Sequence, residues 1–168
     1  MSANSQHYIV KEALINGGIN AVVNGAFAWY LSAGKPELAV WGQSGVLVDF
    51  LATAAILVFI LSLIVLPLQR RKLAKMPLAS AEPPFGFLRY LGWLAPQHDA
   101  LKALILAWLA ALLSLPVLWL GFALFGVDTM GRWDYTLLKS LYTGVVAASV
   151  VVVIVLLAMH PVRRVSHS

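Results

Sequence analysis

The sequence contains no cysteine and very few charged residues. Without cysteine the chain has no disulfide framework, no thiolate metal ligand and no thiol nucleophile. Only 11% of its residues are charged and 61% are hydrophobic, whereas a soluble domain is about a quarter charged and about half apolar. These charges are too few to cover a water-facing surface on a chain of 168 residues. The composition therefore predicts a single domain, residues 1–168, whose surface is largely in contact with the lipid bilayer.

Sequence motifs of common enzyme classes are also missing. The chain has no HExxH zinc motif, no glycine-rich phosphate loop and no GxSxG nucleophile turn. Its histidines are His7, His98, His160 and His167. They lie near the termini or in the middle of the chain, not as the three or four convergent ligands that a zinc site needs. We therefore expect a protein that is not an enzyme and that carries neither a cofactor nor a metal ion.

Four apolar runs are long enough to cross a bilayer, which takes about 20 helical residues. They lie at 13–31, 46–68, 103–125 and 137–159. The predicted fold class is an all-α polytopic membrane protein, a bundle of four transmembrane helices with an interfacial loop at 69–102. The first run could instead be a secretion signal, but its Asn and Gly residues and the preceding Lys11-Glu12 favour a retained span.

The distribution of lysine and arginine predicts the orientation of these spans. Nine of the twelve basic residues would lie on one side of the membrane. The residues that set this topology are Arg70, Arg71, Lys72, Lys75, Arg163 and Arg164. By the positive-inside rule both termini and the middle loop are cytoplasmic. No extended basic face is available to neutralise several phosphates, so we expect no nucleic-acid partner.

The two halves of the chain carry a weak internal repeat. The second run ends in PLQRR and the fourth in HPVRR, and each short loop places a tryptophan seven residues after a glycine: Gly34 to Trp41, and Gly126 to Trp133. Two equally oriented hairpins would form a parallel repeat of the kind found in some transporters. The first and third runs share little sequence, so duplication stays a hypothesis.

The first run contains an unusual pattern, INGGINAVVNG. Three amides recur at intervals of four residues, which places Asn16, Asn20 and Asn24 on one helical face. A row of small residues lies beside them: Gly17, Ala21, Gly25 and Ala28. An amide in hydrocarbon without a partner costs several kcal/mol, so the amide row must face protein, water or a ligand.

Two interpretations of this helix stay open. In the first, the small residues let another helix approach closely while the amides form hydrogen bonds across the interface; that helix belongs to this chain or to a second copy. The first helix would then be the buried one. In the second, the amides line a polar route or bind a small solute. Apart from both, Asn16 could lie near the headgroups as an interfacial start of the helix.

Few residues elsewhere could act together with the amide row. Asp49 is the only acid within a predicted span, and Thr53 follows one turn later. Desolvation could adapt Asp49 to proton coupling, but the position favours the simpler interpretation of an acid at the positive end of a helix dipole that still touches water. Lys139 opens the fourth run at the same depth. An Asp49–Lys139 pair would stabilise helix packing without any chemistry.

In architecture the sequence resembles the small uncharacterised multi-pass proteins of bacterial inner membranes. NGGINAVVNG in the first run and PLQRR after the second carry this resemblance, which implies a location in the inner membrane and brings no ligand. The expected function is that of a non-enzymatic integral membrane protein. It would self-associate as a homo-oligomer or serve as an accessory subunit to a partner membrane protein. The alternative is a minimal permease or channel with a polar route along the first helix.

Overall fold

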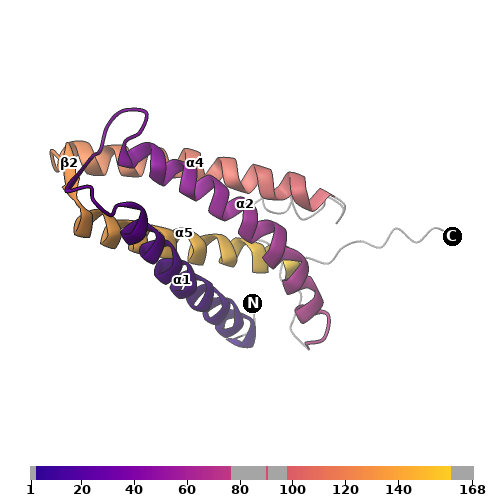
Figure 1. Ribbon diagram of the computed structural model, residues 1–168. Helices are drawn as coiled ribbons and strands as arrows, with labels where there is room; N and C mark the ends of the chain where they lie inside the picture. Colours follow the sequence, from indigo (N-terminus) through magenta and orange to yellow (C-terminus); the bar gives the residue numbers. More distant parts are fainter. Residues whose placement is uncertain (1–2, 77–89, 91–97, 160–168) are drawn as a thin grey trace.

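A computed structural model describes residues 3–76, 90 and 98–159 of the chain (Figure 1). In this part the chain forms four long helices, α1 (Ala3–Leu31), α2 (Val46–Leu73), α4 (Asp99–Leu124) and α5 (Arg132–Met159), and two short strands, β1 (Glu37–Ala39) and β2 (Thr129–Gly131). Helices α2, α4 and α5 are long and apolar enough to cross a membrane. Helix α1 is not among them, because amides, glycines and charged residues interrupt its apolar sequence.

The helices extend beyond the apolar runs from which they were predicted. Helix α1 begins at Ala3 rather than at residue 13, and α2 continues to Leu73 rather than ending at residue 68. The added turns are polar, and hydropathy detects only the part of a helix that suits hydrocarbon. Most of the predicted interfacial loop, and Arg163 and Arg164, lie outside the described residues.

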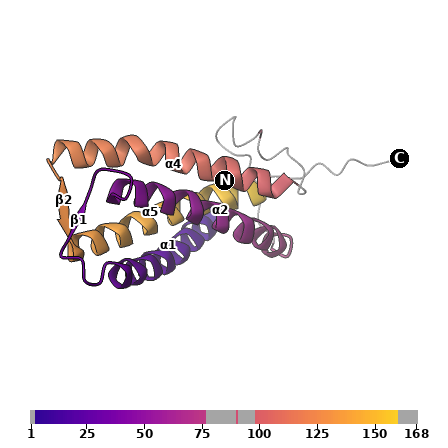
Figure 2. The same ribbon diagram turned by 45° about the horizontal axis from the view of Figure 1, so that its top comes forward.

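The four helices form an open row rather than a closed bundle. Helix α1 packs against α5, α5 packs against α2, and α2 packs against α4; Figure 2 shows them in the order α4, α2, α5, α1. The two inner helices are therefore α2 and α5. Twelve residues of α5 are buried but only six of α1, so the prediction that the first helix is the buried one is wrong. Valine and leucine cover most faces of α5, whereas α1 offers one narrow face of small residues.

Exchanging the two halves of the chain leaves this packing pattern unchanged. Helix α1 leans on α5 of the other half, just as α4 leans on α2, and β1 pairs with β2 in an antiparallel sheet. The facing residues are Glu37 and Gly131, Leu38 and Met130, and Ala39 and Thr129. Gly34 precedes β1 by the same interval as Gly126 precedes β2, with positive φ angles of 79° and 60°. The repeat seen in the sequence thus marks structurally equivalent turns.

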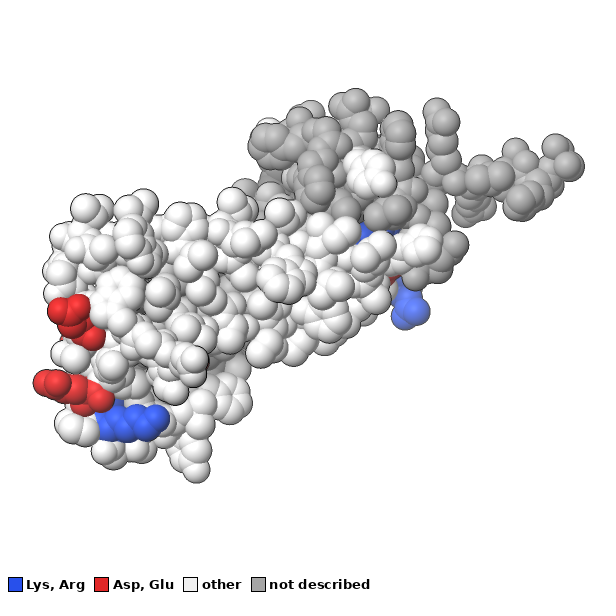
Figure 3. Space-filling model, turned by 90° about the horizontal axis from the view of Figure 1, so that it is seen from above, with Lys and Arg blue, Asp and Glu red and all other residues white. Residues whose placement is uncertain are grey.

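Two apolar clusters form the core, one toward each end of the row. At the end that carries β1 and β2, here called the strand end, Phe50 stacks on Tyr142 with ring centroids 5.0 Å apart and contacts Phe122 edge-on. The opposite end, at Arg70 to Lys75, is here called the basic end. On the face shown in Figure 3, charged side chains lie only at these two ends. This distribution suits a molecule whose middle lies in hydrocarbon.

Candidate functional site

The small residues of α1 bring its backbone directly against α5. A Cβ atom added to Gly17 would lie 2.9 Å from the carbonyl oxygen of Gly144, and one added to Gly25 would lie 3.0 Å from Ser140 Cβ. Ser140 Oγ donates a hydrogen bond to the Ala21 carbonyl oxygen at 2.8 Å. The predicted small-residue face, made of Gly17, Ala21, Gly25 and Ala28, therefore packs on a helix of the same chain.

The amide nitrogens of the row bond to their own helix. Nδ2 of Asn16, Asn20 and Asn24 donates to the carbonyl oxygen four residues earlier, at 2.8, 2.8 and 3.0 Å. All three residues are half-buried at the edge of the contact with α5. Within the described residues no amide of the row bonds across to α2 or α5. Each side-chain amide therefore has one N–H and its Oδ1 oxygen without a hydrogen-bond partner among the described residues.

The amide row continues toward the N-terminus through Glu12 and Tyr8, which contact α2. The Tyr8 hydroxyl donates to Gln69 Oε1, and Gln69 Nε2 donates to Glu12 Oε2, both at 2.5 Å. Lys72 Nζ lies 3.2 Å from Glu12 Oε1. Because residues four apart share a helical face, the amide row lies on the flank of α1 that turns toward α2. Tyr8 precedes the apolar run 13–31. Burial raises the pKa of its hydroxyl, and the nearby Glu12 carboxylate raises it further, so the hydroxyl stays protonated and acts as a donor.

A charged cluster joins α2 to α5 near the strand end. Lys139 Nζ donates to Asp49 Oδ2 at 2.5 Å and to the Tyr135 hydroxyl at 3.2 Å. The Tyr135 hydroxyl donates to Asp49 Oδ2 at 2.9 Å. The Lys139 side chain is 8% exposed and that of Asp49 is 41% exposed. The Asp49–Lys139 pair considered from the sequence is therefore formed, and it compensates a lysine that is almost completely removed from solvent.

Two hydroxyls lie close to this cluster. Thr53 Oγ1 donates to the Asp49 carbonyl oxygen of its own helix at 2.7 Å. Thr143 Oγ1 donates to the Lys139 carbonyl oxygen at 2.8 Å and approaches the Asn20 carbonyl oxygen of α1 at 3.4 Å. Thr143 thus connects the charged cluster to the amide row.

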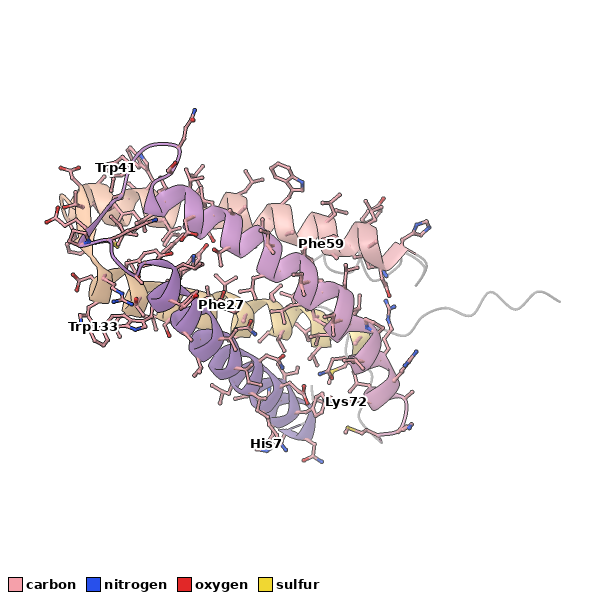
Figure 4. The ribbon with its side chains drawn as sticks, viewed as in Figure 1. His7, Phe27, Trp41, Phe59, Lys72 and Trp133 are labelled. Atoms are coloured by element: carbon pink, nitrogen blue, oxygen red, sulfur yellow. The ribbon has the colours of Figure 1, made fainter. Side chains whose placement is uncertain are left out.

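The basic residues that predict topology take part in contacts of their own. Arg70 pairs with Asp99 at 2.5 Å and so joins α2 to α4, and Lys102 also bonds to Asp99. Arg71 and Lys75 are exposed. Figure 4 shows Lys72 of α2 and His7 of α1 toward this basic end, with Trp41 and Trp133 at the strand end. Ion pairs at the basic end therefore join both outer helices, α1 and α4, to α2.

Several structural residues were missed from the sequence. Tyr135 stands one turn before Lys139 on the same face, a spacing that could have found it. No sequence pattern marks the contact between Tyr8 and Gln69, because the two residues lie far apart in the chain, at the two ends of one hairpin. Arg132 lies 3.5 Å above the Trp29 ring and donates to the Trp29 carbonyl oxygen at 2.7 Å, which fixes the end of α1 on the start of α5.

The part of the chain that the structure describes holds no group of three or more His, Asp or Glu residues able to bind a metal ion. No protein-family model, no curated protein and no solved structure matches the chain.

Proposed function

We propose that this protein is a non-enzymatic integral membrane protein that self-associates in the membrane, with the amide row of α1 at the contact between copies. In this proposal α1 is a fourth span, both termini are cytoplasmic, and the protein resides in a bacterial inner membrane. The observation that carries the proposal is the bonding of Asn16, Asn20 and Asn24, because among the described residues each side-chain amide makes only one hydrogen bond, to its own helix.

The surface beside the row has the character of a helix interface in lipid. Each amide follows an apolar residue, and these residues are exposed: Ile15 by 47%, Ile19 by 58% and Val23 by 44%. Uncommitted amide groups in hydrocarbon are unfavourable, and polar side chains on neighbouring helices satisfy one another there. A second copy presents the same donors and acceptors, so a symmetric contact satisfies both rows at once.

The single change Asn20→Leu tests this proposal. Each interhelical hydrogen bond in a membrane contributes about 0.6–2 kcal/mol, so each bond lost with Asn20 raises the dissociation constant of the dimer by roughly 3- to 30-fold. Native mass spectrometry of the protein in nanodiscs, over a range of protein-to-lipid ratios, measures this constant. Asn4→Leu is the matched control, because Asn4 is exposed and precedes the run 13–31. A monomeric wild type, or equal constants for both variants, rules the proposal out.

A second candidate is a minimal permease or channel, favoured by the continuity of polar groups from Asp49 and Lys139 through Thr143 to the Asn20 carbonyl. The two candidates differ in their response to Asn20→Leu. If the row lines a route, the variant keeps its assembly and loses flux of the solute or ion in proteoliposomes. If the row is an interface, assembly weakens.

A further inference from the structure

A long hollow separates α4 from α5 on the side of the row away from the amides. One cavity of about 910 Å³ opens at the strand end, and a second of about 650 Å³ continues along the helices; both are lined by Val117. The hollow exists because α4 and α5 each pack on α2, while the backbones of α4 and α5 come close to each other at few positions. Val58 of α2 contributes to its lining.

The chemistry of the hollow changes along its length. The second cavity, of about 650 Å³, is lined by leucine, valine and alanine, with only Ser114 and Ser149 as polar residues. Two carboxylates, Glu37 and Asp134, line the cavity at the strand end. Glu37 faces Gly131 across the sheet, and a Cβ atom on Gly131 would lie 3.3 Å from Asp134 Oδ2. Both acids therefore stand beside the same stretch of backbone, and neither forms an ion pair with another described residue.

Gly121 of α4 keeps the cavity at the strand end wide. It lines the hollow, and a Cβ atom added there meets no atom within 4 Å. A glycine weakens a helix relative to alanine, and no side chain of the described part of the protein uses the space that Gly121 leaves. The room beside Gly121 is thus available to a molecule from outside the chain.

We propose that this hollow binds a phospholipid with a primary-ammonium headgroup, of the phosphatidylethanolamine type, from the leaflet at the strand end. One of its two acyl chains lies between α4 and α5, the other stays in the bilayer, and its ammonium group is placed at Glu37 and Asp134. A primary ammonium donates three hydrogen bonds and carries the charge that two carboxylates complement. The lining from Phe125 to Leu106 covers about 28 Å at the helical rise, which is long enough for a lipid chain that crosses one leaflet of about 15 Å.

The size of the cavities favours a lipid over a partner helix. A transmembrane helix about 10 Å across and about 30 Å long fills roughly 2,000 Å³ or more, which exceeds the volume of the two cavities together, about 910 and 650 Å³. A single acyl chain is much thinner than a helix, and it can follow a narrow hollow that stays open to the bilayer along its side.

Gly121→Leu tests the place of the acyl chain. The protein is prepared in detergent with equal amounts of phosphatidylethanolamine, phosphatidylcholine and phosphatidylglycerol, and bound lipid is counted by native mass spectrometry. We expect wild type to retain the ethanolamine lipid about fivefold over the other two, since only its headgroup donates charged N–H bonds to both acids. Gly121→Leu should lose this adduct. Gly18→Leu is the control, because Gly18 of α1 also has open space around it but lies outside the hollow.

The double change Glu37→Gln with Asp134→Asn tests the headgroup. It should remove the preference for ethanolamine over choline lipid while leaving a lipid bound. The proposal is overturned if wild type prefers the glycerol lipid, if Gly121→Leu keeps the adduct, or if Gly121→Leu changes the assembly state instead, which would assign the hollow to a second copy. The self-association proposed above depends on α1 and is read from Asn20→Leu, so either proposal can fail alone.

Discussion

The adjacent glycines Gly17 and Gly18 should respond in opposite ways to the same substitution by alanine. Alanine favours a helix over glycine by about 0.5–1 kcal/mol at either position. Beside Gly18 the added methyl meets no atom, but beside Gly17 it lies 2.9 Å from the Gly144 carbonyl oxygen and 3.0 Å from Ala148 Cβ. Neither neighbour is the end of a flexible side chain, so α1 and α5 must move apart, and overpacking of this kind costs about 1–3 kcal/mol.

The difference between the two variants isolates this packing term, because the helix preference is common to both. We expect Gly18→Ala to be neutral or slightly stabilising, and Gly17→Ala to be less stable than Gly18→Ala by about 1–3 kcal/mol. Reversible unfolding in mixed detergent micelles, followed by circular dichroism at increasing fractions of dodecyl sulfate, measures both free energies. Gly144→Ala should behave like Gly17→Ala, because its Cβ would lie 3.0 Å from Ala21 Cβ. Equal shifts for Gly17→Ala and Gly18→Ala would refute close packing of α1 on α5.

Two further predictions concern the strand end. Asp49→Asn should destabilise the protein more than Lys139→Met does, because it leaves a buried ammonium unpaired, a change that costs about 3–5 kcal/mol at a fully buried pair. The converse change leaves a carboxylate that is 41% exposed and largely screened; the same unfolding assay decides, and equal losses would contradict the unequal burial. The antiparallel register predicts that Glu37→Cys with Gly131→Cys forms a disulfide on mild oxidation, since facing Cα atoms lie about 4.5–5.5 Å apart. Glu37→Cys with Thr129→Cys should not, and mass spectrometry reads both cleanly because the native chain has no cysteine.

Features of the fold could be predicted from the sequence where a residue pattern has a single physical explanation. Long apolar runs located α2, α4 and α5, because a helix in hydrocarbon must satisfy its own backbone. The small residues of α1 were expected to permit a close helix contact, and Gly17 makes one with α5. Asp49 and Lys139 were matched by depth alone, and their side chains meet.

The order of the helices could not be predicted in the same way. Hydropathy states how well a helix suits lipid but not which neighbour it meets, and α5 offers apolar residues on nearly every face. One interpretation had the amides of Asn16, Asn20 and Asn24 form hydrogen bonds to another helix. They donate instead to the backbone carbonyl four residues earlier, which a short polar side chain on a helix can always reach. Strands of three residues are too short for an alternation of polar and apolar residues to be recognised.

The packing of α1 on α5 has a consequence for how the protein is made. Helix α1 leaves the ribosome first and α5 last, yet the closest helix contact in the fold joins them. Until α5 has been made, Gly17 and Gly25 lack the helix on which they pack in the fold, whereas Tyr8 and Glu12 of α1 already have their partner Gln69 on α2. Helix α1 therefore reaches its native packing only after the whole chain through α5 has been made. A nascent chain that stops before Arg132 leaves α1 without its main partner in the fold.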